Sequence, residues 1–178
     1  MITTNVGARR LGRPVRGLDA WDVTSLDATG KPTIEVTATP CRHGPPLSRP
    51  IVGHVIGFAM RWHGQRNGRG VVSGDTVLYN GVRQVVDRFD VDVAILHLGD
   101  VQFPITGPVR YSMTARDAVE LCGELRPRVA IPVHYEGWSH FREGRDAIER
   151  EIGSAPSELR DVFRLIPLGE PVEVGEQS

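Results

Sequence analysis

Three side chains that can bind a metal ion each follow a stretch with the character of a β-strand. His43 lies in a glycine- and proline-rich loop, Asp75 follows the short apolar run VVSG, and His134 follows RVAIPV. Ligand sites of layered α/β proteins gather at the carboxyl ends of strands. Histidine and aspartate together are the donors of a catalytic zinc or a similar ion. The pattern therefore makes these three residues candidate ligands of a metal centre.

Each of the three also has an ordinary interpretation, because aspartate after glycine is common in turns and a loop histidine often binds nothing. Other catalytic motifs fail at single positions. Val71 stands where the first glycine of a G-x-S-x-G elbow around Ser73 belongs, and Ser73 replaces the third glycine of a dinucleotide loop. The sequence has no G-x-x-x-x-G-K-[ST] loop and no Cys-x-x-Cys pair.

The elements that position these residues follow from hydrophobic periodicity. Strands are predicted at 33–39, 52–62, 71–74, 91–99 and 128–133, with a strand-like FRLIPLG near the end. Helices are predicted at 80–89, 112–125 and 139–152, with another from Ser157. Thr114 and Asp117 have the spacing of a capping box. The order of the elements, with strands first and then strands alternating with helices, predicts one α/β layered domain over residues 1–178.

Composition limits the class of protein. A chain of 178 residues can bury a core, and its formal net charge of -1 gives no indication of a nucleic-acid surface. No apolar run approaches the length of a membrane span, and MITTNVGARRLG lacks the apolar centre of a signal peptide. Cys41 and Cys122 are interpreted as reduced, buried apolar residues. We expect a cytoplasmic protein.

The segments TATPCRHGP, VVSGDTVLY and AIPVHYEGW resemble the third, fourth and fifth metal motifs of the metallo-β-lactamase superfamily. The similarity is greatest to its branch of ascorbate-6-phosphate lactonases and N-acylphosphatidylethanolamine phospholipase D. The resemblance implies an αββα sandwich with one or two divalent metal ions, zinc first, with manganese or iron as alternatives. It also implies that His43 binds the first metal, that Asp75 bridges two metals and that His134 binds the second.

One departure from the family is clear, because the sequence contains no H-x-H-x-D-H motif. We therefore expect the C-terminal part of a longer fold, with a metal site that lacks donors. His54 and His63 are alternative donors. His97 and Asp100, at the end of another strand, are better placed to add a donor, to orient the ligands or to contact substrate. Tyr135, Trp138 and Phe141 are candidates for a substrate pocket, although packing in the core or rim explains them equally well.

The leading hypothesis is a metal-dependent hydrolase, in which metal-activated water attacks a lactone or other ester, an amide, a thioester or a phosphodiester. Asp75 and His134 are its candidate catalytic residues, and a small-molecule or lipid-like compound is its expected substrate. The alternative is an inactive half that serves as a binding or interaction module. A third interpretation, a metal-free α/β binding domain, remains open. A sheet without its partner layer would expose apolar surface, so we expect poor solubility, a homo-oligomer or a complementing N-terminal half.

Overall fold

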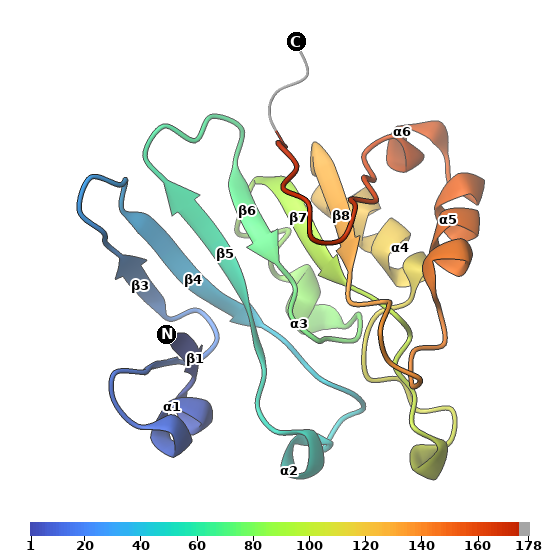
Figure 1. Ribbon diagram of the computed structural model, residues 1–178, viewed down its shortest axis with the longest axis horizontal. Coiled ribbons are helices and arrows are strands. Elements are labelled where there is room, and N and C mark those ends of the chain that lie inside the picture. Colours follow the sequence, from blue (N-terminus) through green and yellow to red (C-terminus); the bar gives the residue numbers. More distant parts are fainter. Residues whose placement is uncertain (175–178) are drawn as a thin grey trace.

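A computed structural model describes residues 1–174, and its main element is a six-stranded mixed sheet (Figure 1). In spatial order the strands are β3 (Val23–Leu26), β4 (Ile34–Pro40), β5 (Ile56–Trp62), β6 (Arg69–Val72), β7 (Val91–His97) and β8 (Val129–Val133). Strands β3 to β6 pair antiparallel, whereas β6, β7 and β8 run parallel. Consequently β4, β6, β7 and β8 share one direction, and their carboxyl ends meet at one end of the sheet.

One face of the sheet packs against helices. The helices that follow β6 are α3 (Asn80–Arg83), α4 (Ala115–Leu125), α5 (Arg145–Ser154) and α6 (Ser157–Arg160). The row Ala59, Val71, Ala94 and Ala130 crosses four strands in register and belongs to the buried core. Buried residues of α4 belong to the same core cluster, and α5 and α6 pack against α4.

Helix α4 begins as its sequence predicts. Thr114 Oγ1 accepts a hydrogen bond of 3.0 Å from the Asp117 amide, and the Thr114 amide donates one of 3.0 Å to Asp117 Oδ2. This reciprocal pair is a complete capping box. The helix buries five residues, Ala115, Ala118, Leu121, Cys122 and Leu125. The predicted capping box is therefore confirmed, although the helix begins three residues after the predicted start at residue 112.

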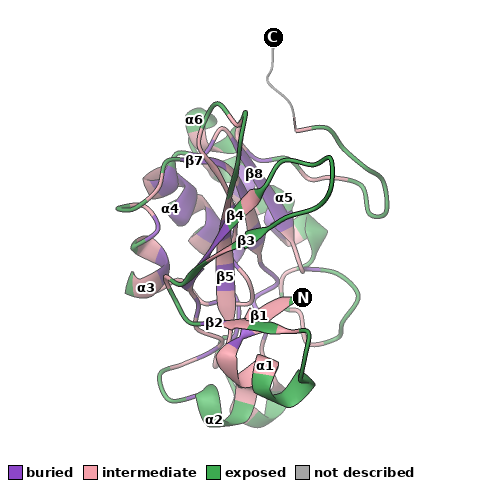
Figure 2. Ribbon diagram, turned by 90° about the vertical axis from the view of Figure 1, so that its left-hand side faces the viewer, coloured by how far each residue is buried: buried purple, intermediate pink, exposed green. Residues whose placement is uncertain are grey.

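The opposite face of the sheet is apolar but only half-buried. Its side chains lie in register across β5, β6 and β7 and include Phe58, Met60, Val72, Val93 and Ile95. None of these five belongs to the buried core cluster. Helices α3 and α4 lie on the other side of the sheet, while the C-terminal segment runs across this side near β7 and β8 (Figures 1 and 2).

Several boundaries differ from the predictions. The strand predicted at 52–62 begins at Ile56, because α2 (Arg49–Val52) occupies the start of that range. The helix predicted at 139–152 begins at Arg145, after Gly144 at its N-cap. The helix predicted at 80–89 is regular only over α3. FRLIPLG forms no regular strand, but Phe163 bridges to Ala130 and the Arg164 amide donates to the Ala130 carbonyl at 2.8 Å.

The N-terminal residues form a separate small layer that the predictions missed. Strand β1 (Ile2–Thr4) pairs in parallel with β2 (Arg16–Leu18), and α1 (Asn5–Leu11) connects them. A 3-10 turn, η1 (Pro104–Thr106), lies between β7 and α4. No helix within residues 1–174 is long and apolar enough to cross a membrane.

Candidate metal centre

The candidate ligands lie where the parallel strands of the sheet end. His43 is three residues beyond β4, Asp75 three residues beyond β6, His97 is the last residue of β7, and His134 comes directly after β8. Because these four strands share one direction, all four side chains start from the same end of the sheet. This placement agrees with the site that the sequence predicts.

Asp75 and His134 come closest to each other. Oδ1 of Asp75 lies 3.7 Å from Nε2 of His134. Two ligand atoms of a tetrahedral zinc ion, each about 2 Å from the metal, are separated by roughly 3.3 Å. His134 has a φ of +60°, in the left-handed region that residues other than glycine seldom adopt. Such backbone strain is concentrated at functional sites, and here it accompanies a donor pair with spacing close to that of two zinc ligands.

His97 joins this pair from β7. Its ring centroid lies 5.6 Å from that of His134. Burial lowers the pKa of His97, the Asp75 carboxylate opposes that shift, and the neighbouring His134 adds to it. A lowered pKa favours the neutral imidazole, which keeps a lone pair for a metal ion or a substrate hydrogen. The structure therefore brings Asp75, His97 and His134 together.

His43 contacts Tyr111, in the segment that precedes α4. Its Nδ1 atom lies 2.8 Å from the carbonyl oxygen of Tyr111, and the two rings are 5.6 Å apart. A protonated Nδ1 that donates to this carbonyl leaves Nε2 as the nitrogen able to bind a metal. Nδ1 of His134 also faces a carbonyl oxygen, that of Leu98, at the longer distance of 3.5 Å. Both histidines thus direct Nε2 away from the backbone.

The loops that carry His43 and Asp75 are hydrogen-bonded to each other. The Arg42 amide donates to Thr76 Oγ1 at 3.0 Å, and the Val77 amide donates to the Arg42 carbonyl at 3.0 Å. Even so, within residues 1–174 no three His, Cys, Asp or Glu side chains lie close enough together to hold one metal ion. His43 and the Asp75–His134 pair are therefore separate parts of the candidate centre.

The other predicted site residues have different surroundings. Asp100 is buried with a φ of +45°, and its carboxylate accepts from Gln102 Nε2 at 2.7 Å and pairs with Arg110 Nε at 3.2 Å. Tyr135 lies in the hydrophobic core. The Trp138 side chain is 68% exposed. Among these three, only Trp138 presents its side chain to solvent near the strand ends.

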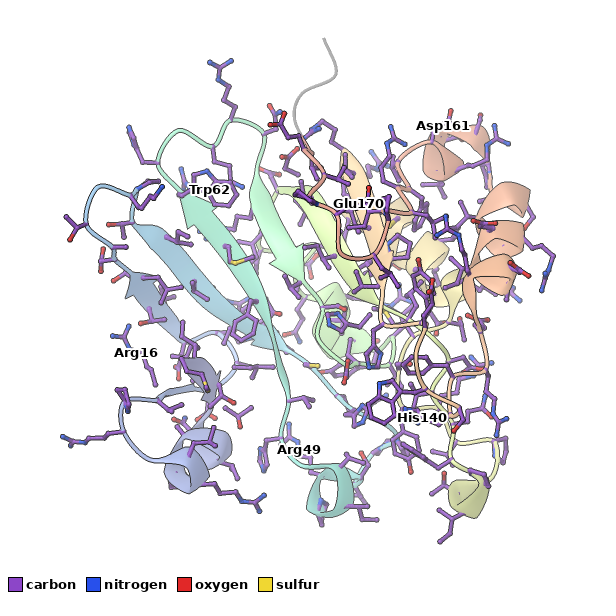
Figure 3. All side chains as sticks on the ribbon, in the orientation of Figure 1. Arg16, Arg49, Trp62, His140, Asp161 and Glu170 are labelled. Carbon is purple, nitrogen blue, oxygen red and sulfur yellow. The ribbon has the colours of Figure 1, made fainter. Side chains whose placement is uncertain are left out.

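A series of six rings links His43 to His134. Neighbouring ring centroids lie 4.9 to 5.6 Å apart. In order, the rings are those of His43, Tyr111, Phe103, His140, Phe141 and His134. Figure 3 shows His140 among the loops beyond the strand ends. The sequence analysis named His43, His134 and Phe141 but not His140, and nothing in the sequence connects Tyr111 or Phe103 to the site.

The two cysteines take no part in metal binding. Both are buried, and burial raises the pKa of each thiol to about 12. A thiol with such a pKa stays protonated near neutrality and is a poor nucleophile and ligand. Cys41 donates to the Asp75 carbonyl at 3.4 Å, so it supports the loop that carries the carboxylate. Their interpretation as buried apolar residues is confirmed.

Comparisons with known proteins identify the family of the chain. The family model described as "Beta-lactamase superfamily domain" matches residues 2–135. A UPF0173 metal-dependent hydrolase from Opitutus terrae is 32% identical over 166 residues, covering 89% of this chain and 65% of the relative. One from Deinococcus radiodurans is 34% identical over 141 residues, covering 78% and 54%. The chain thus spans less than two thirds of the length of these relatives.

Solved structures have the same fold at low identity. A possible metal-dependent hydrolase from Veillonella parvula aligns with a TM-score of 0.75 and 21% identity, covering 95% of this chain and 64% of the other. Isothiocyanate hydrolase from Delia radicum gut bacteria aligns with a TM-score of 0.75 and 17% identity over the same shares. These likenesses confirm the predicted metallo-β-lactamase-type α/β fold. Because the family model covers most of its residues, the chain belongs to the metallo-β-lactamase superfamily.

Proposed function

We propose that this chain carries part of the active site of a metal-dependent hydrolase, with His43, Asp75 and His134 as ligands. The observation that carries the proposal is the approach of Asp75 Oδ1 to His134 Nε2, two good metal donors 3.7 Å apart at a shared strand end. A bound divalent metal, zinc first and manganese or iron as alternatives, lowers the pKa of a water molecule and polarises the bond under attack.

The residues of this chain have distinct roles in the proposal. Asp75 has two carboxylate oxygens and can face two ions at once, as its resemblance to the bridging ligand implies. His134 offers Nε2 beside it, and its ring packs edge-on against Phe141. The Tyr111 carbonyl holds the tautomer of His43. His97, next to both Asp75 and His134, is placed to accept or donate a hydrogen bond to substrate.

The donor set favours a partner that completes the site. Residues 1–174 do not gather three donors at one point, and the sequence lacks the H-x-H-x-D-H motif. A catalytic zinc ion has three protein ligands and one open position. We propose that the remaining donors come from another polypeptide segment that covers the half-buried face around Met60 and Ile95. A complementing N-terminal half fits this role, and a second copy of the chain is the alternative.

The chemistry of metal-activated water indicates the general class of substrate. Water attack suits a small or lipid-like compound that carries an ester, lactone, amide or phosphodiester bond. The same incomplete donor set favours a second candidate, an inactive half that serves as an interaction module. In that case Asp75 and His134 would form only a hydrogen bond or an ion pair with each other.

Metal analysis tests the proposal and separates the two candidates. The purified chain, equilibrated with micromolar zinc and desalted, should keep zinc close to one equivalent by elemental analysis. His134→Ala and Asp75→Asn should each lose at least nine tenths of it. His63→Ala is the control, because His63 is exposed in the turn after β5. A chain that keeps no zinc shows that its own donors do not hold the metal and supports the interaction module. A chain that keeps zinc in all variants contradicts the assignment of Asp75 and His134 as ligands.

A further inference from the structure

His140 lies in a stack of three rings beside the candidate metal centre. Its ring lies 5.1 Å from Phe103 at an interplanar angle of 33°, and 5.6 Å from Trp138 at 35°. These angles are closer to stacked than to edge-on packing. Phe141 contacts His140 edge-on at 5.0 Å and His134 at 4.9 Å. The stack is therefore one ring removed from a candidate ligand, and Trp138 forms its exposed end.

The His140 backbone is fixed, while its ring nitrogens have no partner. The Gln102 amide donates to the His140 carbonyl at 3.1 Å. Across residues 1–174, the structure records no hydrogen bond to either nitrogen of the His140 ring. Neither nitrogen is among the buried side-chain atoms of residues 1–174 that lack a partner, so both are open to solvent. A neutral imidazole has one donor and one acceptor, and both are therefore available to a bound ligand.

Trp138 adds an exposed flat surface at the same place. An indole that is 68% exposed contributes little to stability, yet one side of it is occupied by the His140 ring. Planar aromatic surfaces pack favourably against other flat groups in offset stacks. The stack thus combines an open flat surface with unpaired polar atoms, next to the ligands proposed above.

We propose that Trp138 and His140 form the subsite that receives a flat group of the substrate, an aromatic or otherwise planar acyl or leaving group. Trp138 stacks on this group, and His140 hydrogen-bonds its polar substituent. The inference rests on the proposed function, because it places the substrate against the same metal centre. It makes these two side chains determinants of specificity rather than ligands.

Two small hydroxamates test the inference on the zinc-loaded chain. Acetohydroxamate and benzohydroxamate share a metal-chelating head and differ in a methyl or a phenyl group. By isothermal titration calorimetry, benzohydroxamate should bind about tenfold more tightly, a ratio in the range that an aromatic contact supports. Trp138→Ala should remove this preference and leave both the zinc content and the acetohydroxamate affinity unchanged. Trp62→Ala is the control, since that indole lies at the opposite end of the sheet, where β5 ends.

A third ligand isolates the hydrogen bond of His140. For 4-hydroxybenzohydroxamate, the wild-type chain should show several-fold tighter binding than for benzohydroxamate. His140→Phe keeps a ring in the stack and should remove only this additional affinity.

The possible failures can be told apart. A chain that binds no zinc lacks the metal centre against which this inference places the substrate, and the inference falls with it. Zinc binding without any phenyl preference, or with a preference that survives Trp138→Ala, overturns the flat-group subsite alone. A hydroxyl preference unchanged in His140→Phe overturns the role of the imidazole. Zinc binding with no hydroxamate binding also contradicts the inference.

Discussion

Ser73 Oγ accepts a hydrogen bond of 2.9 Å from the amide of His97, and so joins the end of β6 to the end of β7. The same hydroxyl donates to the Gly74 carbonyl at 3.0 Å, and Ser73 is buried. One side chain therefore fixes both the turn that carries Asp75 and the backbone of His97. This explains why a serine stands at the position where a dinucleotide loop would have glycine.

Replacing Ser73 with alanine should destabilise the fold. The His97 amide would lose its partner inside the protein, and an unsatisfied buried donor costs about 1–3 kcal/mol. Urea denaturation of Ser73→Ala should show a loss of this size. Ser154→Ala is the matched control, because its hydroxyl bonds the Glu151 carbonyl on the exposed surface and its loss should cost less than about 0.5 kcal/mol. Equal losses in both variants would contradict the structural role of Ser73.

Gly44 is expected to be essential for the position of His43. It has a φ of +91°, and a Cβ atom there would lie 2.7 Å from the Tyr111 ring. Gly64 also has a φ of +91°, but a Cβ atom would meet nothing within 4 Å. Both alanine variants carry the backbone strain, whereas Gly44→Ala alone must also displace Tyr111. Thermal denaturation should show the larger loss for Gly44→Ala, and zinc binding should weaken in that variant alone.

Glu143 should make stability depend on pH. Its Oε2 atom accepts from the Ala115 amide at 2.7 Å. Burial raises the pKa of Glu143, the Asp100 and Asp117 carboxylates raise it further, and the Ala115 hydrogen bond opposes them. The folded protein therefore holds a proton that the unfolded chain has lost, between the ordinary glutamate pKa of about 4.3 and the raised value. Stability should fall as pH rises through this interval.

Glu143→Gln provides the test of that pH dependence. The glutamine oxygen can still accept from the Ala115 amide, but it carries no charge to desolvate. Relative to wild type, the variant should gain stability as pH rises above the ordinary glutamate pKa and show no gain below it. Urea denaturation series at several pH values measure the difference. Parallel curves for the two proteins would show that Glu143 carries no raised pKa.

Local sequence signals predicted much of the fold and of the donor set. The capping box at Thr114 and the strands before Asp75 and His134 depend on neighbouring residues. Such local patterns can be recognised in a single sequence. His43, Asp75 and His134 could be named because each follows such a strand. Their common direction was not visible, because it depends on the antiparallel pairing of β4 with β5 and of β5 with β6.

The rings around the site could not be predicted for a different reason. Tyr111 and Phe103 lie in the long connection between β7 and α4, and only tertiary packing brings them to His43 and His140. The periodicity of residues 139–152 also placed Phe141 within a predicted helix. In the structure its ring packs on His134 and α5 begins at Arg145, because tertiary contacts outweigh weak helix propensity.

The apolar face around Met60 should drive association of the isolated chain. Met60, Val72 and Ile95 are half-buried on the side of the sheet opposite α4, and exposed apolar surface of this kind marks interfaces. Sedimentation velocity over a range of concentrations should show dimers or larger species. Met60→Lys should shift the population toward monomer, because a charge on this face cannot be buried without a partner. Ser157→Lys adds the same charge on the exposed surface of α6 and should leave association unchanged. A stable monomer at all concentrations would show that the face needs no partner.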